Sequence, residues 1–342
     1  MKKFLKFFAG GIALLLIVLA LGLAYLLNAQ DDLDKVAHLL EKPASVEPET
    51  GTVTVQYLGN TNLLFSDGET SILIDGWFTR PGTFETLLLQ IEPDTAAIDA
   101  ALQRGGVDKL AVVIPAHSHY DHAMDSPLVA QRTSADLIGS QSTLNIARGL
   151  GFDETRFRLV EDRGDFSYGK FQVTLLKSKH FAFPGGPLGG KDKDTEIIDK
   201  PLVPPVSAFD YKMGGAYSIL IRHPQGSALV QGSAGFVEGL FEDQKVDVVF
   251  LGVGGLAEQS DNYMDDYWTH VVEALDAQKI YPVHWDSFTH PLGEEPELPN
   301  LLLDKVLGLR AIDGIKWVET KAGDTIKVGL LPMWEKVGPF SH

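Results

Sequence analysis

Residues 110–122 read LAVVIPAHSHYDH and carry the strongest structural signal in the chain. The apolar run at the start predicts a buried strand, and a cluster of polar side chains follows it after a proline. Alternate residues of an extended chain point the same way, so His117 and His119 can share one ion. Asp121 and His122 then turn toward a second position. Because imidazole and carboxylate groups together suit zinc, iron or manganese, this segment predicts a metal site at a strand end.

The composition indicates a folded chain and excludes several kinds of site. Of the 342 residues, 44% are apolar and 22% are charged, which is typical of a globular protein. The absence of cysteine rules out disulfides, thiolate metal sites and a cysteine nucleophile. The formal net charge of −17 argues against a nucleic-acid partner, because nucleic-acid grooves need a basic surface.

The N-terminal segment predicts a membrane anchor. Residues 7–27 contain no charged side chain, and 21 residues suffice to cross a hydrocarbon core about 30 Å thick. A cleaved signal peptide is the open alternative, although its usual small residue two positions before Ala29 is replaced by Leu27. Three lysines precede the segment and aspartates follow it, so the positive-inside rule predicts a cytoplasmic N-terminus and an extracytoplasmic body.

The remainder divides into a connector and one large domain. We expect residues 1–30 to be the anchor, 31–50 an acidic linker, and 51–342 the folded domain. Strand-like runs alternate with helical stretches in both halves of this domain, which indicates sheets inside with helices outside. The expected helices are 96–104, 127–132, 142–150, 267–277 and 300–309, and the expected strands are 52–58, 62–65, 70–74, 110–114, 171–176, 216–221, 227–230, 246–251, 279–283 and 325–328. Residues 181–210 are rich in glycine and proline, which is typical of a lid or a binding loop.

The pattern HxHxDH after a buried strand resembles the metallo-β-lactamase-fold superfamily, and the resemblance extends over nearly all of residues 51–330. The upstream sequence Leu73-Ile74-Asp75-Gly76 is similar to the first motif of that superfamily, whose aspartate supports the metal-site loop. The resemblance implies an α+β fold, a four-layered αβ/βα sandwich with its site at one edge. It also implies Zn²⁺ as the cofactor, with manganese or iron as alternatives.

The same resemblance assigns two further ligands from distant parts of the chain. His180 and His284 match the later histidines of the superfamily in order and spacing. The local sequence around His284 looks most like that of the branch holding ascorbate-phosphate lactonases and N-acyl-phosphatidylethanolamine phospholipases D. The implied first ion has the ligands His117, His119 and His180, and the implied second ion has Asp121, His122 and His284.

Ser233 departs from the pattern of that branch. A metal-bridging aspartate normally follows a late strand in a Gly-Asp pair, whereas this chain reads Gly232-Ser233. A hydroxyl is a poorer ligand than a carboxylate, so we expect a weaker second ion and either one or two ions in all.

The predicted activity is metal-dependent hydrolysis of an ester, lactone, amide or phosphodiester by a hydroxide held at the metal. Asp121 would orient this hydroxide, and Ser233 would donate a hydrogen bond to it. His270 resembles a histidine near the active site of the phospholipase branch, with a helix-entry role as the alternative.

The loop after His180 predicts the substrate class. Its apolar side chains would line a pocket for a small or lipid-derived molecule, or would anchor the loop on the core. The residues concerned are Phe181, Phe183, Phe209 and Tyr211.

Two other functions share these residues. A non-catalytic binding protein on a decayed hydrolase fold would explain Ser233 but not the retention of six ligands. An iron-dependent oxidoreductase of the same fold would use the same ligand set. The sequence makes no prediction of the oligomeric state.

Overall fold

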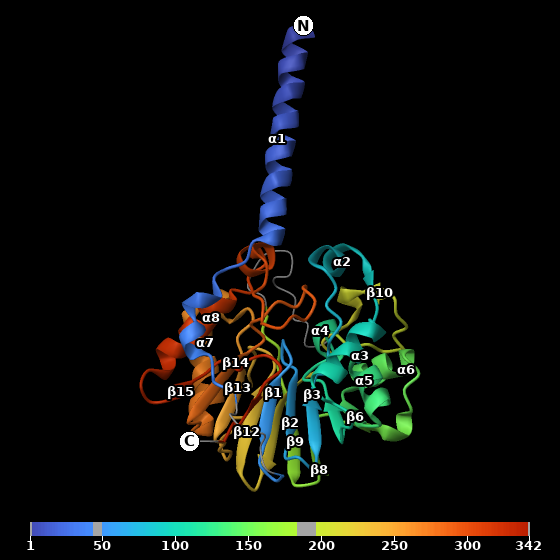
Figure 1. Cartoon of the computed structure of the whole chain (residues 1–342), viewed down its shortest axis with the longest axis vertical. Helices are drawn as coiled ribbons and strands as arrows, with labels where there is room; N and C mark the ends of the chain where they lie inside the picture. Colours follow the sequence, from blue (N-terminus) through green and yellow to red (C-terminus); the bar gives the residue numbers. More distant parts are fainter. Residues whose placement is uncertain (1, 44–49, 183–195, 341–342) are drawn as a thin grey trace.

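Two seven-stranded sheets pack face to face in the computed structural model, which describes residues 2–43, 50–182 and 196–340. The first sheet has the order β16-β1-β2-β3-β5-β6-β7, and the second has the order β15-β14-β13-β12-β11-β9-β8. A small two-stranded sheet pairs β10 with β4. Figure 1 shows the helices outside the sheets and α1 extending away from the domain. The expected α+β sandwich is therefore confirmed.

The first sheet has these strands: β1 (Thr54–Tyr57), β2 (Leu63–Ser66), β3 (Ser71–Ile74), β5 (Val112–Ile114), β6 (Asp136–Gly139), β7 (Phe157–Leu159) and β16 (Lys336–Val337). The second sheet has these strands: β8 (Arg163–Tyr168), β9 (Phe171–Ser178), β11 (Ala216–His223), β12 (Gly226–Gln231), β13 (Val248–Gly252), β14 (Lys279–Val283) and β15 (Lys327–Val328). The small sheet consists of β4 (Gln90–Ile91) and β10 (Val206–Ser207).

The α-helices are α1 (Lys2–Asn28), α2 (Thr83–Leu88), α3 (Thr95–Arg104), α4 (Tyr120–Ala123), α5 (Ser126–Thr133), α6 (Gln141–Gly149), α7 (Asp261–Tyr267) and α8 (Ala311–Ala322). Short turns of other helix types are η1 (Leu33–Lys35), η2 (Ala37–Leu39), η3 (Glu154–Arg156), η5 (Ala208–Asp210), η6 (Leu256–Glu258), η7 (Trp268–Val272), η8 (Glu273–Leu275) and η9 (Leu302–Val306).

Alternation along the strands builds two apolar layers. Ile72 and Ile74 of β3 face the core between the sheets, whereas Leu73 faces the helices that cover the first sheet. Across the central layer, Phe65 and Phe250 meet edge to face with ring centroids 5.3 Å apart. The apolar faces of both sheets are thus buried, which explains why the central strands are apolar at consecutive positions.

Strand direction gathers the polar motifs at one edge. β3, β5, β6 and β7 run parallel in the first sheet, and β12, β13 and β14 run parallel in the second. Carboxyl ends of parallel strands lie together, so the residues after β5, β12 and β14 meet at the same end of the sandwich. β9 ends there too, because it and β12 both pair antiparallel with β11.

The segment after α1 is packed on the domain. The Ala29 carbonyl accepts the amide of Leu301 at 2.8 Å, and Val36 is fully buried in the central core. Leu40 bridges to Leu330 farther along. Residues 31–43, which we expected to form part of a linker, therefore belong to the packed fold, since burial and backbone pairing fix them.

Candidate metal centre

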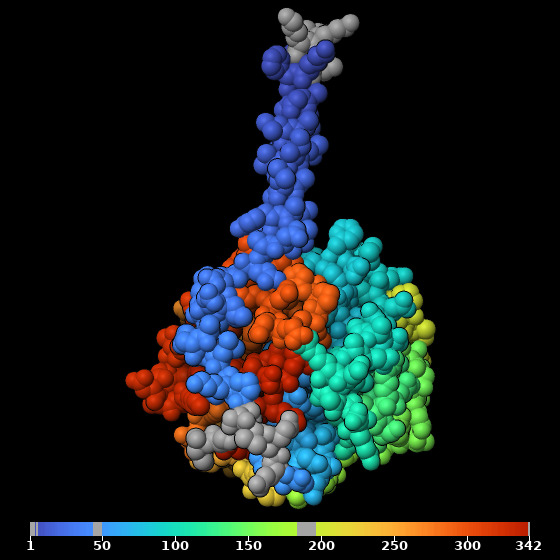
Figure 2. Space-filling view, viewed as in Figure 1, coloured from blue at the N-terminus to red at the C-terminus, as the bar shows by residue number. Residues whose placement is uncertain are grey.

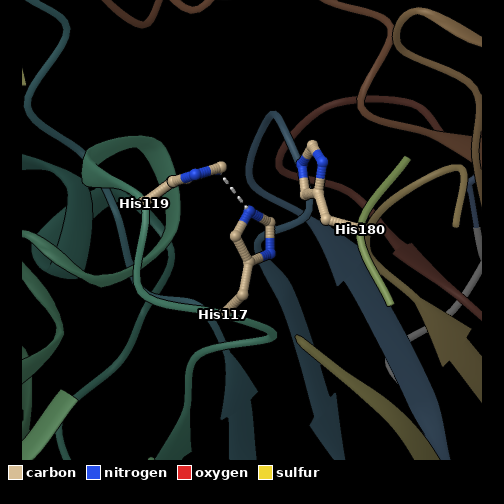
Figure 3. Close-up of side chains that lie close together, drawn as sticks. All are labelled: His117, His119 and His180. Carbon is tan, nitrogen blue, oxygen red and sulfur yellow. Dashed lines mark hydrogen bonds between the residues drawn. The ribbon is translucent and has the colours of Figure 1, made fainter. Parts of the chain in front are cut away.

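Three histidines from two sheets converge at the site edge. His117 and His119 follow β5, and His180 follows β9 on the opposite sheet. One ring nitrogen of each lies within 4.8 Å of the others, and Figure 3 shows the rings grouped around a common space. His117 Nε2 is 3.0 Å from His119 Nδ1. The packing of the two sheets therefore creates a three-nitrogen set that the local sequence supplies only in part.

A second set lies directly beside the first. Asp121, His122 and His284 each place a ligand atom within 4.8 Å of the other two. His284 Nε2 is 3.2 Å from Asp121 Oδ2, and the His117 and His122 rings have centroids 3.9 Å apart. The structure thus brings together all six side chains that the sequence pattern and the resemblance selected.

Asp75 fixes the orientation of His122. Its Oδ2 accepts a hydrogen bond from His122 Nδ1 at 2.7 Å, and its Oδ1 accepts the backbone amide of Ala116 at 2.7 Å. A carboxylate only accepts, so the proton of His122 is held on Nδ1 and the lone pair of Nε2 faces the site. This is the supporting position that the first motif implies for Asp75.

Buried polar atoms at this centre fit a cation. His122 Nε2 and His117 Nδ1 are buried and, among the residues that the structure describes, have no hydrogen-bond partner. A buried nitrogen without a partner is costly unless something else binds it, and a divalent ion is an acceptable partner for a lone pair. Two sets of three nitrogen or oxygen ligands are each a usable catalytic metal site.

The electrostatics favour the metal-binding protonation states of His117, His180 and Asp121. Burial lowers the pKa of His122, but the carboxylates of Asp75 and Asp121 raise it by more, so His122 would release a proton on binding a metal. Burial and the neighbouring His122 hold the pKa of His117 well below its usual range. Burial also lowers the pKa of His180 to about 4. Burial raises the pKa of Asp121, but the adjacent His122 and His284 lower it by more, so this carboxyl is ionised. Neutral imidazoles beside an ionised carboxylate are the ligand forms that bind divalent metals.

The loop carrying His284 is held in a strained conformation by a buried network. His284 has a φ of 60°, and its amide donates to the Asn60 carbonyl at 2.8 Å. The Asn60 side chain donates to the Asp121 carbonyl at 2.6 Å, and its backbone amide donates to Asp286 Oδ1 at 2.6 Å. Asp286 in turn lies 3.7 Å from the buried guanidinium of Arg80. Asn60 therefore connects the two loops that supply the second ligand set.

A cavity of about 470 Å³ opens beside the ligands. His119, Asp121, His180 and His284 form one part of its wall, so a bound ion would face the cavity. Much of the remaining wall is apolar and comes from segments far apart in the chain: Leu87, Phe181, Phe209, Met213, Phe288, Leu303, Leu307 and Leu309. A metal centre open to an apolar cavity is typical of an enzyme that holds a partly apolar substrate.

Three of the predicted substrate-loop residues line this cavity. Phe181 stacks on the His180 ring with centroids 4.6 Å apart, and Phe209 is 45% exposed at the wall. Tyr211 is buried, and burial raises the pKa of its hydroxyl, which has no hydrogen-bond partner among the described residues. Phe183 lies outside the described residues.

Ser233 and His270 do not contribute to the cavity wall in the described part of the chain. Ser233 follows β12, and its buried hydroxyl has no hydrogen-bond partner among the described residues. His270 lies in η7 and stacks on Phe236 with ring centroids 5.5 Å apart. Their proposed catalytic roles remain predictions.

Several residues of the site were not among the candidates predicted from the sequence. Thr86 and Leu87 of α2 line the cavity, as do Lys212 and Glu196, whose side chains form an ion pair at 3.1 Å. Arg80 and the hydrogen bonds that Asn60 makes to Asp121 and Asp286 were not predicted either. A buried arginine has no local sequence signal, although Asp286 lies only two residues after His284.

Comparison with known proteins connects this geometry to a family of enzymes. A family model described as the metallo-beta-lactamase superfamily matches residues 55–230. The chain is similar to a UPF0173 metal-dependent hydrolase of Pyrobaculum islandicum, with 22% identity over 280 residues, 80% of this chain and 99% of the relative. It is 24% identical to a UPF0173 metal-dependent hydrolase of Symbiobacterium thermophilum over 237 residues, 68% of this chain and 84% of the relative.

Solved structures share the fold. The E377D mutant of the CmlA beta-hydroxylase superposes with a TM-score of 0.51 and 14% sequence identity, covering 86% of this chain and 55% of that one. At this identity the likeness concerns the fold alone.

Proposed function

Because the chain belongs to the metallo-beta-lactamase superfamily and is a metal-dependent hydrolase, we propose that it cleaves an ester, lactone, amide or phosphodiester bond in a lipid-derived substrate with Zn²⁺. The observation that carries this proposal is that four candidate ligands share a wall with the apolar lining of one cavity. Such a cavity would hold an acyl or other apolar group while the scissile bond lies at the ligands.

The ligand chemistry supports zinc as the metal. Five imidazoles and one carboxylate make up the two sets, and the chain has no cysteine to supply thiolate. Nitrogen-rich sets disfavour magnesium and calcium, which prefer oxygen ligands. Divalent ions of this kind, when bound, lower the pKa of water and polarise the oxygen of a scissile bond.

The side chains around the site have separate tasks. Asp121 is ionised and accepts from His284, so it can orient a water beside the ligands. Asp75 holds the proton of His122 on Nδ1 and thereby keeps the opposite nitrogen available. Phe181 and Phe209 would exclude water from the apolar part of the substrate, and the Tyr211 hydroxyl would donate to a substrate oxygen.

We also propose that α1 remains as a membrane anchor with the domain on the extracytoplasmic side. An 18-residue window within residues 6–28 has a mean hydropathy of 2.6, and none of this window is buried against the domain. Lysines in the first two turns of α1 and aspartates after α1 give the charge asymmetry of a cytoplasmic N-terminus. The intact mass of the purified membrane protein and protease accessibility of the domain in sealed vesicles test both parts. A mature chain beginning near residue 30 would exclude the anchor.

The activity is tested with the full chain in phosphatidylcholine nanodiscs. Substrates are short-chain and long-chain nitrophenyl esters, a lactone, an anilide and a nitrophenyl phosphodiester. We expect turnover to be lost on chelation and restored by Zn²⁺. The variant His117→Ala should also be inactive, whereas His38→Ala, at an exposed histidine paired with Glu319, should match the wild type.

The outcomes separate the proposal from its competitors. Full activity after chelation, or in the His117→Ala variant, would refute metal-dependent hydrolysis in this site. Equal turnover of short and long acyl chains would refute the lipid-derived substrate. Restoration by Fe²⁺ alone with oxygen consumption would indicate the oxidoreductase, and purified protein without metal would indicate a binding protein.

A further inference from the structure

Large apolar side chains are exposed on two elements, α2 and η9, that also contribute residues to the cavity wall. On α2, Phe84 and Leu88 are 61% and 67% exposed, and Leu89 follows directly at 50%. On η9, Val306 is 57% exposed. We call these four residues the apolar collar. Exposed apolar residues grouped around a site entrance, unlike scattered ones, indicate a surface that binds something apolar.

The collar lies at the end of the domain from which α1 leaves. The Ala29 carbonyl, one residue past α1, accepts the amide of Leu301, and the Asp31 carboxylate lies 3.1 Å from Lys305 Nζ. Asn300 pairs with Gln30 and donates to Thr83 at the start of α2 at 2.7 Å. Figures 1 and 2 show α2 at the level where α1 enters the domain.

This attachment leaves no spacer between α1 and the domain. If α1 crosses a bilayer, its last turn reaches the interface, and the next residue is already hydrogen-bonded to the domain. The face that carries the collar is then held against the lipid headgroups. An exposed leucine or phenylalanine at that depth gains by entering the interfacial layer.

The collar elements also form the cavity wall. Thr86 and Leu87 of α2 line the cavity between the collar positions Phe84 and Leu88. Leu303 and Leu307 line it on either side of Val306. The two collar elements thus contribute Leu87, Leu303 and Leu307 to the same cavity wall that carries candidate ligands.

We propose that the apolar collar inserts into the interfacial layer of the bilayer that α1 crosses, and that the cavity receives an amphiphilic substrate directly from this layer. The proposal rests on the proposed function and adds the source of its substrate. The bilayer is the occupant, because the attachment of α1 fixes which surface faces the collar. The net charge of −17 gives no general attraction to anionic lipid, so contact depends on the apolar side chains.

Depth-dependent quenching tests insertion without any need for a known substrate. The chain has no cysteine, so Leu88→Cys and Val306→Cys each introduce a single labelling position for an environment-sensitive fluorophore. Ser167→Cys, on the exposed β8 strand at the opposite end of the domain, is the control. Each labelled full chain is placed in phosphatidylcholine nanodiscs with or without lipid that is spin-labelled near the headgroup.

We expect quenching of at least twofold at positions 88 and 306 and none at 167. Equal, negligible quenching at all three positions would overturn the proposal. A blue-shifted but unquenched label at 88 or 306 would also overturn it, since that result indicates contact with protein or a second copy.

A kinetic comparison tests substrate entry. The double variant Leu88→Ser and Val306→Ser should lower kcat/KM at least tenfold for a long-chain nitrophenyl ester embedded in nanodiscs. It should leave kcat/KM for a soluble short-chain ester unchanged, because neither side chain lines the cavity. An equal loss on both esters, or no loss on the embedded one, would contradict entry from the bilayer. Absence of hydrolysis in the wild type would instead refute the proposed function, while quenching would still report on insertion.

Discussion

Replacing Asp75 by asparagine should weaken one ligand set and spare the other. Asp75 Oδ2 accepts the Nδ1 proton of His122 at 2.7 Å, and both side chains are fully buried. In Asp75→Asn the amide oxygen can still accept from Ala116, but the amide nitrogen then faces His122 Nδ1. Two N–H donors cannot pair, so His122 must carry its proton on Nε2. That nitrogen then has no lone pair to offer a metal ion.

The magnitude follows from the bond that is lost. A buried hydrogen bond to a charged partner contributes about 1.5–3 kcal/mol. Mutation of a residue that orients a metal-bound histidine costs about 10–100-fold in metal affinity, which is the same range. We therefore expect metal affinity at the set of Asp121, His122 and His284 to fall by about 10–100-fold. Affinity at the other set should change little, because His117, His119 and His180 make no bond to Asp75 in the described structure.

The assay is a competitive chelator titration of the metal-free full chain, with bound metal counted by mass spectrometry. The wild type should bind in two steps, and the variant should keep the first step while the second moves to higher metal concentration. Asp125→Asn is the matched control, since this buried carboxylate accepts from Phe78 and Thr79 and not from a candidate ligand. Unchanged affinity in both steps, or equal weakening of both, would refute the reasoning.

Three further changes have defined outcomes. Asn60→Gly keeps the left-handed backbone but removes the donor to the Asp121 carbonyl. The metal at the set of Asp121, His122 and His284 should therefore bind about tenfold more weakly, and an unchanged chelator titration would contradict this. Gly149→Ala places a methyl group in collision with the Leu202 carbonyl oxygen and should lower the free energy of unfolding by about 1–3 kcal/mol. An unchanged midpoint of urea unfolding would be the contrary result. Burial raises the pKa of Asp67, but two backbone amides lower it to below 3.8, so its carboxylate stabilises the fold at neutral pH and this stability is lost as the pH falls through the folded pKa. Asp67→Asn should therefore be less stable at about pH 5–7 and approach the wild type under more acidic conditions in urea titrations with chelator, and a deficit that grows at low pH would count against the assignment.

Local patterns in the sequence predicted much of the fold. The apolar run before His117 forms β5, and the expected helix at 96–104 forms α3 over Thr95–Arg104. Hydrophobic periodicity and turn residues involve only a few neighbouring positions. They therefore predict local structure without knowledge of the rest of the chain. The helix expected at 267–277 is present as a continuation of α7. It consists of a π-helical turn, η7, followed by a 3-10 turn, η8.

Elements stabilised by distant partners were missed. The strands β6, β7 and β8 and the helix α8 did not enter the sequence prediction. β8 alternates between exposed and half-buried residues and, among the strands of the described residues, pairs with β9 alone, so its conformation depends on that neighbour. Packing against the sheet, more than intrinsic propensity, determines such segments.

The kind of chemistry and the apolar character of α1 can both be read from the order of residues. His117, His119, Asp121 and His122 lie within six residues, and their side-chain chemistry and spacing indicate a metal regardless of the fold around them. Folding in three dimensions was needed to show that His180 and His284 meet this cluster and that Asn60 connects the two ligand loops. The same holds for the apolar side chains that α2 and η9 place beside the cavity and near the end of α1. The physical reason is that these contacts join residues far apart in the chain, and strand pairing and sheet packing bring such residues together.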